Sequence, residues 1–314
     1  MRRADILFIP GMVLLLAGCA TSSPSRPARP VHYTVSAAHT WQLNLPDGQR
    51  FDASGLFLTP KQELLTVSDR GPSVYRIQIR PDTSNADLVL LTNCFTAAQL
   101  APFAASKIGR YDVEGVTEDK RGRIYICEEA NRWILRFDPH SQKVERLNID
   151  WSRVQKYFSP VDNNASFEGV AIGDGKLYVA NERDQGRLIV VDLATLKVVD
   201  DFVVRSSVAS LWGPHYSDLC WFRGELFVLM REDHVVLRVN PQSHEVLAEY
   251  DFRGLELSPE NEYRRASWFF GVMEGLAVDD DSFWLVTDNN GYGRKRYPRD
   301  TRPTLFQCPR PDRH

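Results

Sequence analysis

The sequence predicts an all-β fold made of a repeated four-stranded unit, and three observations support this prediction. A nine-residue block with a mostly apolar interior aligns five times without a gap. A short motif, of the Glu-Gly type in three copies, precedes each block, and further strand-like runs follow it. Successive copies of the motif lie 49 to 60 residues apart. Four-stranded antiparallel units at this period are typical of the blades of a β-propeller.

Each block is predicted to form a strand that is buried on both faces. It begins with a polar residue, continues with four mostly apolar residues rich in β-branched and aromatic types, and ends in a polar or charged cluster. This pattern is typical of an interior strand that ends at a solvated or functional rim. The five blocks are 63–71, 123–131, 176–184, 225–233 and 282–290.

The last unit looks incomplete, because only one strand-like run follows its block. That run is 304–308, while the N-terminal run 40–45 has no unit of its own. We therefore expect the N-terminal strand to complete the final unit as its outermost strand, which closes the ring and covers its edges. The count predicts five blades. Six blades are the alternative, with a further unit hidden in a long connection such as 95–111 or 205–216.

Residues 1–18 have the features of a secretory signal peptide and are not expected to belong to the fold. A basic start is followed by an apolar stretch that is too short to span a bilayer. The sequence Leu-Ala-Gly-Cys at 16–19 resembles the lipobox of bacterial lipoproteins, which predicts cleavage before Cys19 and acylation of this cysteine. Several acyl chains on one residue anchor a protein stably. Ala20, not Asp, follows the cysteine, and the resemblance to Gram-negative lipoproteins then implies the outer membrane, so we expect a lipoprotein that faces the periplasm and is held by outer-membrane lipid.

Composition divides the remaining chain into a tether, one domain and a short tail. Residues 19–38 are rich in Pro and Ser and are expected to be an extended, lipidated tether. The propeller is expected to occupy 39–309, and 310–314 form the tail. The whole chain has a hydrophobic fraction of 43%, which is sufficient for a full core, and a net charge of −3, which leaves no basic excess. Nucleic acid is therefore not expected as a partner.

Four cysteines besides Cys19 show no spacing that is typical of a metal site or a disulfide framework. Whether Cys94, Cys127, Cys220 and Cys308 pair in an exported protein is left open. Cys127 and Cys220 lie within apolar runs and are expected to be small buried hydrophobic residues.

Two rings of polar side chains are predicted at one mouth of the central channel. The motif opens the first strand of each unit and the block ends with the second strand, so antiparallel pairing places these two ends side by side. The first ring comprises Ser54, Glu114, Glu168, Ser217 and Glu274. The second ring comprises Asp69, Glu129, Glu182, Arg231 and Asp288.

The three glutamates of the first ring repel one another unless something neutralises them. A hard cation with oxygen ligands is one solution, and Ca²⁺ suits an irregular oxygen cage better than Mg²⁺. The alternative is that each carboxylate caps backbone N–H groups of the neighbouring unit and that no metal is bound. The glycine that follows each glutamate permits close backbone approach near the axis in both cases.

Two further side chains at this mouth have alternative interpretations. Arg231 interrupts the acidic second ring and is expected either to pair with Asp69 or Asp288 or to hold an anionic substrate group. His215 lies on the connection into the fourth unit, where a neutral imidazole near carboxylates can act as a general base. The alternative for His215 is an ordinary surface histidine.

The ordered motifs resemble those of one protein family. They are Ser-Gly-Leu at 54–56, Asp-Val-Glu-Gly-Val at 112–116 and Phe-Glu-Gly-Val at 167–170, each followed by its acidic block end. This series resembles the phytase-like family, often labelled "esterase-like activity of phytase", and is similar to the related SdiA-regulated family of exported propellers. The resemblance covers most of residues 50–290.

The resemblance implies a propeller of the broad group that includes gluconolactonases, in which a Glu of a Glu-Gly motif helps to hold a central Ca²⁺. By this analogy the candidate metal ligands are Glu114, Glu168 and Glu274. Ser217-Asp218 replaces Glu-Gly in the fourth unit, and Arg231 replaces an acid, so both positions depart from the pattern.

These observations lead to two functional hypotheses. The first is a metal-dependent hydrolase, phosphatase-like or esterase-like, that acts on a phosphoester, ester or lactone with the help of Ca²⁺. The second is a non-catalytic propeller of the cell envelope that binds a ligand or a protein. In the first hypothesis a small anionic or ester substrate is held by Arg231 and Asn289. The candidate catalytic groups are Asp69, Glu129, Glu182, Asp288 and His215.

Overall fold

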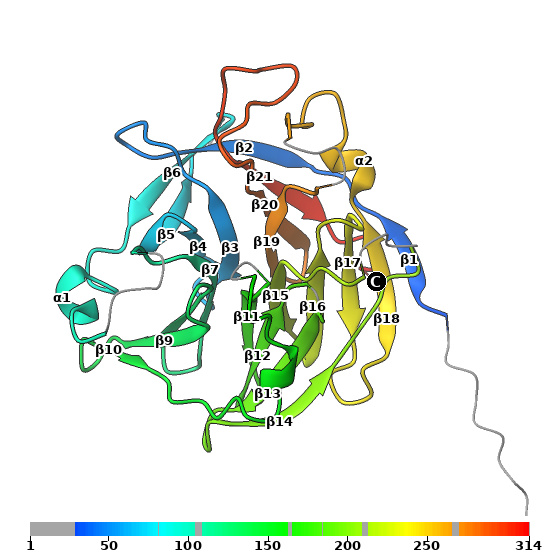
Figure 1. The fold of residues 1–314 in the computed structure, drawn as a ribbon. Coiled ribbons are helices and arrows are strands. Elements are labelled where there is room, and N and C mark those ends of the chain that lie inside the picture. The colour runs from blue at the N-terminus through cyan, green and yellow to red at the C-terminus, as the bar shows by residue number, and fades with distance from the viewer. Residues whose placement is uncertain are drawn as a thin grey trace, which may run out of the picture.

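The computed structural model of the 314-residue chain describes residues 29–80, 82–103, 109–162, 165–183, 185–208, 213–265 and 270–313. The all-β prediction is confirmed, because antiparallel sheets account for nearly all of the regular structure (Figure 1). The signal peptide at 1–18 and the lipidation site Cys19 lie outside the described residues.

The chain forms successive antiparallel units, each containing one copy of the repeated block as its second strand. Unit 1 consists of β3 (Ala53–Leu58), β4 (Leu64–Ser68), β5 (Gly71–Ile79) and β6 (Asn85–Leu90). Unit 2 consists of β7 (Val113–Glu118), β8 (Ile124–Glu128), β9 (Trp133–Asp138) and β10 (Lys143–Arg146). Unit 3 consists of β11 (Phe167–Gly173), β12 (Lys176–Asn181), β13 (Arg187–Asp192) and β14 (Lys197–Phe202).

The last two units include strands from the N-terminus. Unit 4 consists of β15 (Asp218–Phe222), β16 (Glu225–Met230), β17 (Val235–Val239) and β18 (Val246–Asp251), with β1 (Val31–Thr34) added in parallel at its outer edge. Unit 5 consists of β19 (Met273–Val278), β20 (Ser282–Thr287), β21 (Thr304–Pro309) and β2 (His39–Asn44). In unit 5, β2 pairs antiparallel with β21, and it also pairs in parallel with β6 of unit 1.

One part of the predicted domain division is wrong. Residues 31–34 belong to the expected tether, but they form β1 and pair with 248–251 of β18. The ring of Tyr33 stacks on that of Tyr250, with centroids 5.3 Å apart. Composition alone does not reveal such a strand, because its partner lies more than two hundred residues away in the sequence.

The first strands of the units gather at the centre of the molecule, as Figure 1 shows. They contact one another in the order β3, β7, β11, β15 and β19, and β19 in turn contacts β3. Tight turns keep the first and second strands aligned. In units 3 and 4 the two turn residues, Asp174-Gly175 and Arg223-Gly224, all have positive φ, as type I′ hairpin turns require.

The core is distributed between neighbouring units instead of forming one central cluster. One apolar cluster, for example, joins Phe227 and Leu229 of unit 4 to Leu276 and Phe283 of unit 5. Each of the other unit interfaces buries a similar cluster. This arrangement explains why the second strands are apolar on both sides: one side faces the preceding unit and the other faces the following unit.

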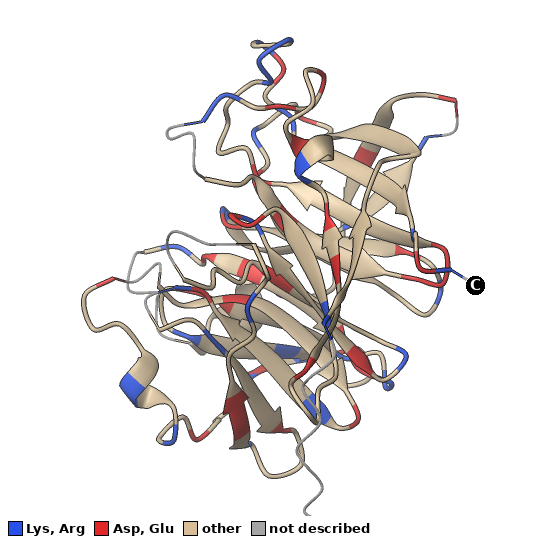
Figure 2. Cartoon of the chain, turned by 90° about the vertical axis from the view of Figure 1, so that its right-hand side faces the viewer, with Lys and Arg blue, Asp and Glu red and all other residues tan. Residues whose placement is uncertain are grey.

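Helical segments are few and short: α1 (Ala97–Leu100), η1 (Gln155–Tyr157) and α2 (Arg253–Glu256). Within the described part of the chain, none of them has the length and apolar character needed to cross a membrane. The four described cysteines are free thiols, three of them buried and Cys220 partly buried. Acidic and basic positions are interspersed along strands and loops (Figure 2).

Candidate functional site

β-Bulges place the glutamates of the first ring. The pairing of β7 with β8 shifts register between Val113 and Gly115, so that Glu114 is left without a partner in the ladder. Equivalent shifts occur in units 1, 3 and 5, at Ser54, Glu168 and Glu274. A bulge leaves one residue unpaired and redirects its side chain. In unit 4 the pairing is regular, and Ser217 lies just before β15.

The glycine after each bulged residue allows the units to approach closely. A Cβ on Gly115 would lie 2.8 Å from the carbonyl oxygen of Glu168, and a Cβ on Gly55 would lie 2.8 Å from that of Glu114. Such contacts are too short for any other residue. The Glu-Gly motif therefore combines a bulge that redirects an acid with a residue that has no side chain to obstruct the neighbouring strand.

The second ring lies beside the first. The backbone N–H of Glu129 donates to the carbonyl of Asp112 at 2.8 Å, and those of Glu182 and Asp288 donate to the equivalent carbonyls of Ser166 and Val272 at 2.8 Å. In unit 1 the backbone N–H of Asp69 instead donates to the hydroxyl of Ser54 at 3.1 Å. The two sequence motifs thus meet at one mouth.

Three acids of this mouth form a compact group. One oxygen each from Asp112, Glu114 and Glu129 lies within 4.8 Å of the others. Glu168 and Glu274, two of the three predicted metal ligands, are not members of this group, whereas Asp112 and Glu129 are. Among the described residues this is the group of carboxylates spaced most suitably for a shared cation.

Burial and mutual repulsion raise the pKa values of the mouth acids. Burial is the main cause at Glu114, whose pKa is well above its usual value, and the charges of Glu168, Asp112 and Asp69 raise it further. Burial together with the charges of Glu114 and Asp112 raises the pKa of Glu129 to about 10. Uncompensated carboxylates thus crowd this side of the mouth, and each disfavours the ionisation of its neighbours.

Asp69 and Asp288 have pKa values closer to neutrality. Burial, with the charges of Asp52 and Asp112, raises the pKa of Asp69 to about 6. Burial and the charge of Asp52 raise that of Asp288 to about 7, although the backbone N–H of Asn290 donates to it at 2.6 Å. Groups with such pKa values can exchange protons at physiological pH.

Arg231 is held by three glutamates. Its Nη2 donates to Glu182 at 2.6 Å, its Nε donates to Glu232 at 3.0 Å, and its Nη1 donates to Glu274. The expected pairing with Asp69 or Asp288 is therefore wrong. The reason is geometric: Glu182 and Glu274 come from the units on either side of Arg231, so the guanidinium spans the wall of the mouth between units 3 and 5.

His215 lies close to the group formed by Arg231 and its glutamate partners. Its Nδ1 is 3.5 Å from a carboxylate oxygen of Glu232, and its side chain is 11% exposed. It is therefore mostly buried, which does not fit the surface-histidine alternative. Its nearest carboxylate, Glu232, also binds Arg231, so His215 lies behind the wall formed by that arginine.

Asp218 explains the departure of the fourth unit from the Glu-Gly pattern. Its fully buried carboxylate accepts backbone N–H groups of Leu56 at 3.2 Å and Leu276 at 2.8 Å, from units 1 and 5. Asp218 thus accepts backbone N–H groups of neighbouring units, which is the role considered for the glutamates. No backbone hydrogen bond to the carboxylates of Glu114, Glu168 or Glu274 is found within the described ranges. Asp218 joins the first strands of three units at the centre.

A cavity of about 460 Å³ opens beside the acidic group. It lies between the ends of the second strands and the connection that leads from β18 to β19. Glu274, Asp288 and Asn289 contribute to its acidic and polar wall. Five arginines also line it: Arg50, Arg183, Arg231, Arg264 and Arg265.

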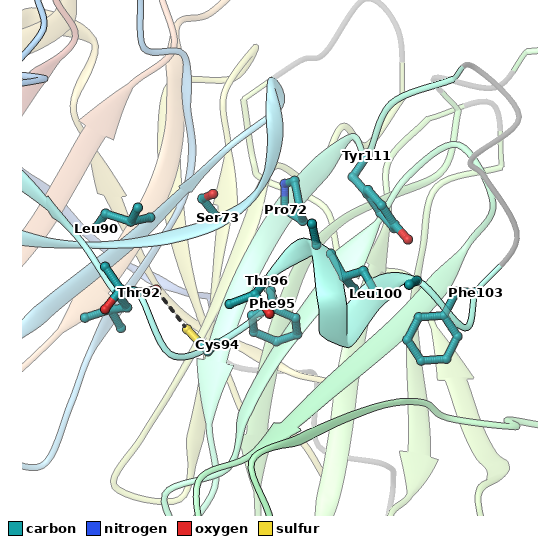
Figure 3. A pocket seen from close by; sticks show the side chains of 13 residues that line it. Pro72, Ser73, Leu90, Thr92, Cys94, Phe95, Thr96, Leu100, Phe103 and Tyr111 are labelled. Atoms are coloured by element: carbon teal, nitrogen blue, oxygen red, sulfur yellow. Dashed lines mark hydrogen bonds between the residues drawn. The ribbon is translucent and has the colours of Figure 1, made fainter.

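A second cavity, of about 590 Å³, has a different character (Figure 3). It lies between β6, α1 and the start of unit 2, and Leu90, Phe95, Leu100, Phe103 and Tyr111 are among its lining residues. None of the described residues that line it is charged. It therefore lacks groups for acid–base or metal chemistry, and the acidic mouth is the better candidate site.

Some residues of the mouth were missed by the sequence analysis. Asp112 and Asp52 occupy the same position, two residues before the bulged residue, so the repeat register already contains the signal for them. Glu232 and Arg183 share a position directly after the second ring. Arg264 and Arg265 lie in a connection without counterparts in other units, and no sequence signal marks them.

Comparison with known proteins identifies a matching family. Residues 51–291 match the family described as "Phytase-like: Esterase-like activity of phytase". No curated protein matches the chain.

Solved structures include similar folds at low sequence identity. The crystal structure of glutaminyl cyclase from Myxococcus xanthus has a TM-score of 0.59 at 12% identity, covering 89% of this chain and 97% of that chain. Virginiamycin B lyase from Staphylococcus aureus has a TM-score of 0.44 at 12% identity, covering 86% of this chain and 99% of that chain. At 12% identity, the similarity to the glutaminyl cyclase concerns the fold alone.

Proposed function

The chain belongs to the phytase-like family of β-propellers, and on this premise we propose that it is a five-bladed, Ca²⁺-binding hydrolase of the cell envelope. The five copies of the block and the cyclic contacts of the first strands support the blade count. The pairing of β2 with β21 supports closure of the ring by the N-terminal strand. The substrate class is a phosphoester, ester or lactone.

The observation that carries this proposal is the group of Asp112, Glu114 and Glu129. All of its ligand atoms are carboxylate oxygens, which hard cations such as Ca²⁺ prefer. At the same mouth, Asp69 Oδ1 is buried and has no hydrogen-bond partner among the described residues, so it is left for water or substrate. We propose that Glu168 supports the site from the adjacent unit, since its charge acts on Glu114.

Bound Ca²⁺ would supply Lewis-acid polarisation of the substrate oxygen and of water. The chain's own residues supply the proton transfers. Asp69, whose pKa is about 6, lies next to the metal-binding group and takes a proton from the attacking water. Asp288, with a pKa of about 7, lines the adjacent cavity and returns a proton to the leaving group.

The remaining candidate residues have supporting roles in this proposal. Glu182 and Arg231 bind each other and keep the wall between units 3 and 5 rigid. His215 orients Glu232 from behind that wall. Asn289 contacts substrate in the cavity beside the acids. We further propose that the chain is anchored to the outer membrane through acylated Cys19 and faces the periplasm.

The proposal is tested first by Ca²⁺ binding. Full-length protein in detergent is stripped with chelator and titrated with Ca²⁺ in a calorimeter. We expect binding that is lost in the double variant Glu114→Gln/Glu129→Gln and retained in Glu145→Gln, which changes an exposed acid paired with Arg136. Equal binding by both variants would refute the metal site.

Catalysis is tested separately with aryl phosphates and aryl esters. We expect Asp69→Asn to lower kcat by roughly 10²-fold or more while Ca²⁺ binding persists, as is usual when a general base is removed. If the unmodified protein hydrolyses none of these compounds while it still binds Ca²⁺, the non-catalytic binding propeller becomes the better hypothesis.

A further inference from the structure

Three residues that line the cavity beside the acidic group carry polar atoms that the protein itself leaves unsatisfied. Arg265 Nε, Asn289 Oδ1 and Glu274 Oε2 are all buried and have no hydrogen-bond partner among the described residues. All three residues line the cavity of about 460 Å³. Buried polar groups are almost always paired in folded proteins, so several such atoms at one cavity indicate that a ligand completes them.

The side chains that carry these atoms are held firmly by their other contacts. Asn289 Nδ2 donates to the carbonyls of Tyr292 at 2.6 Å and Thr301 at 2.8 Å, which fixes the amide orientation with Oδ1 as the free acceptor. Arg265 donates to Glu256 at 2.6 Å and is only 8% exposed in its side chain. Both groups are thus oriented in advance of binding.

The charges of the cavity favour an anion. Guanidinium groups outnumber carboxylates among its lining residues. Arg231 is fully engaged by glutamates, but Arg264 is exposed and has no ion pair or hydrogen bond from its side chain within the described ranges. A guanidinium that is free in this way, beside the unsatisfied Nε of Arg265, matches a carboxylate or a similar planar anion.

Two aromatic rings complete the cavity. Phe270 is 45% exposed and Tyr292 is 43% exposed, and both line it. Exposed rings next to fixed polar groups are typical of small-molecule sites, and the volume lies within the usual range for them. The rings provide apolar surface for the body of a ligand, while Asn289 and Glu274 accept hydrogen bonds from it.

We propose that this cavity binds a small carboxylic acid that carries a hydroxyl or amino group next to a ring-bearing or otherwise apolar body. Arg264 and Arg265 hold the carboxylate, Asn289 Oδ1 and Glu274 Oε2 accept from the hydroxyl or amino group, and Phe270 and Tyr292 pack against the body. The inference rests on the proposed function in taking the mouth as the binding site. It extends that function by naming the acid portion of the substrate or product.

A matched series of compounds tests this proposal on the full-length protein in detergent, by calorimetry in the presence of chelator. Racemic 3-phenyllactate and phenylalanine carry a ring, a carboxylate and a donor group. 3-Phenylpropionate lacks the donor group, and 3-phenyl-1,2-propanediol lacks the carboxylate. We expect at least one of the first two compounds to bind about tenfold more tightly than 3-phenylpropionate, and the diol not to bind measurably.

Variants locate the binding. Arg264→Gln is expected to weaken binding of the best acid about tenfold, and Arg264→Lys by less. Arg223→Gln is the control, because it removes another exposed positive charge, paired there with Asp280, from the β15–β16 turn at the other end of the unit. Equal effects of Arg264→Gln and Arg223→Gln, or no binding by any of the four compounds at millimolar concentration, would overturn the proposal.

Because turnover and Ca²⁺ are absent from these titrations, their outcome is distinct from that of the proposed function. If the acids bind but no aryl compound is hydrolysed, the proposed ligand site stands and the proposed hydrolase activity is refuted. If aryl esters are hydrolysed but none of the acids binds, the proposed hydrolase activity stands and the proposed carboxylic-acid ligand is refuted.

Discussion

Asp69 and Asp288 show how crowding of buried acids links proton binding to stability. Burial is the first cause of their raised pKa values, which are about 6 and about 7 against an ordinary value of 3.8. A raised pKa means that the folded protein binds the proton more tightly than the unfolded chain does. The resulting stabilisation is complete below the ordinary pKa and is lost as the pH rises through the folded values.

We therefore predict that, in chelator, the free energy of unfolding falls between about pH 4 and pH 7. The expected change is on the order of 3 kcal/mol for each carboxyl, since one pKa unit corresponds to about 1.4 kcal/mol. Urea unfolding followed by tryptophan fluorescence measures it. Asp69→Asn and Asp288→Asn should each flatten the curve, and unchanged slopes in both variants would show that these carboxyls titrate normally.

The bulge with its following glycine is the feature that matters most at the scale of a single element. A Cβ on Gly115 would lie 2.8 Å from the backbone oxygen of Glu168 and 3.0 Å from the nitrogen of Val170. Both are backbone atoms of the neighbouring first strand, so neither can move without shifting that strand. The position of Glu114 therefore depends on the absence of a side chain next to it.

Gly115→Ala is predicted to lower the free energy of unfolding by roughly 1–3 kcal/mol, the usual cost of overpacking a core. It should also weaken Ca²⁺ binding, because Glu114 and Glu168 move apart. Gly71→Ala is the matched control, since a Cβ there meets nothing within 4 Å. The account fails if the two variants unfold at the same urea concentration and bind Ca²⁺ equally.

The same elements show what a single sequence reveals. The bulged acids and the block ends were predictable because they recur in register and because pairing places them together. The partners of Arg231 were not predictable, because they depend on which neighbouring side chains reach it across two unit interfaces. Arg264 lies in a connection without a repeat, and its position depends on tertiary packing alone. Periodic features were therefore found, and features that occur once were missed.

At the scale of the whole molecule, the N-terminal residues 31–44 tie three units together. β1 pairs with β18 of unit 4, and β2 pairs both with β21 of unit 5 and with β6 of unit 1. Trp41 and Leu43 of β2 are also buried in the apolar cluster between units 5 and 1. A ring without this segment would expose the edges of three strands, β6, β18 and β21, and part of its core.

Two truncations separate these contributions. Deletion of residues 1–34 removes β1 and its pairing with an outer edge, and we expect a loss of about 1–2 kcal/mol, because β1 is short and mostly exposed. Deletion of residues 1–45 also removes β2, and burial of Trp41 and Leu43 alone contributes roughly 1.5–3 kcal/mol each. Such a loss approaches the total stability of many domains, so the longer truncation should unfold without cooperativity or aggregate through the exposed edge of β21. Urea unfolding and size-exclusion chromatography distinguish the two outcomes. If the longer truncation unfolded as cooperatively as the shorter one, β2 would not be needed for ring closure, and the contacts between the inner strands would suffice.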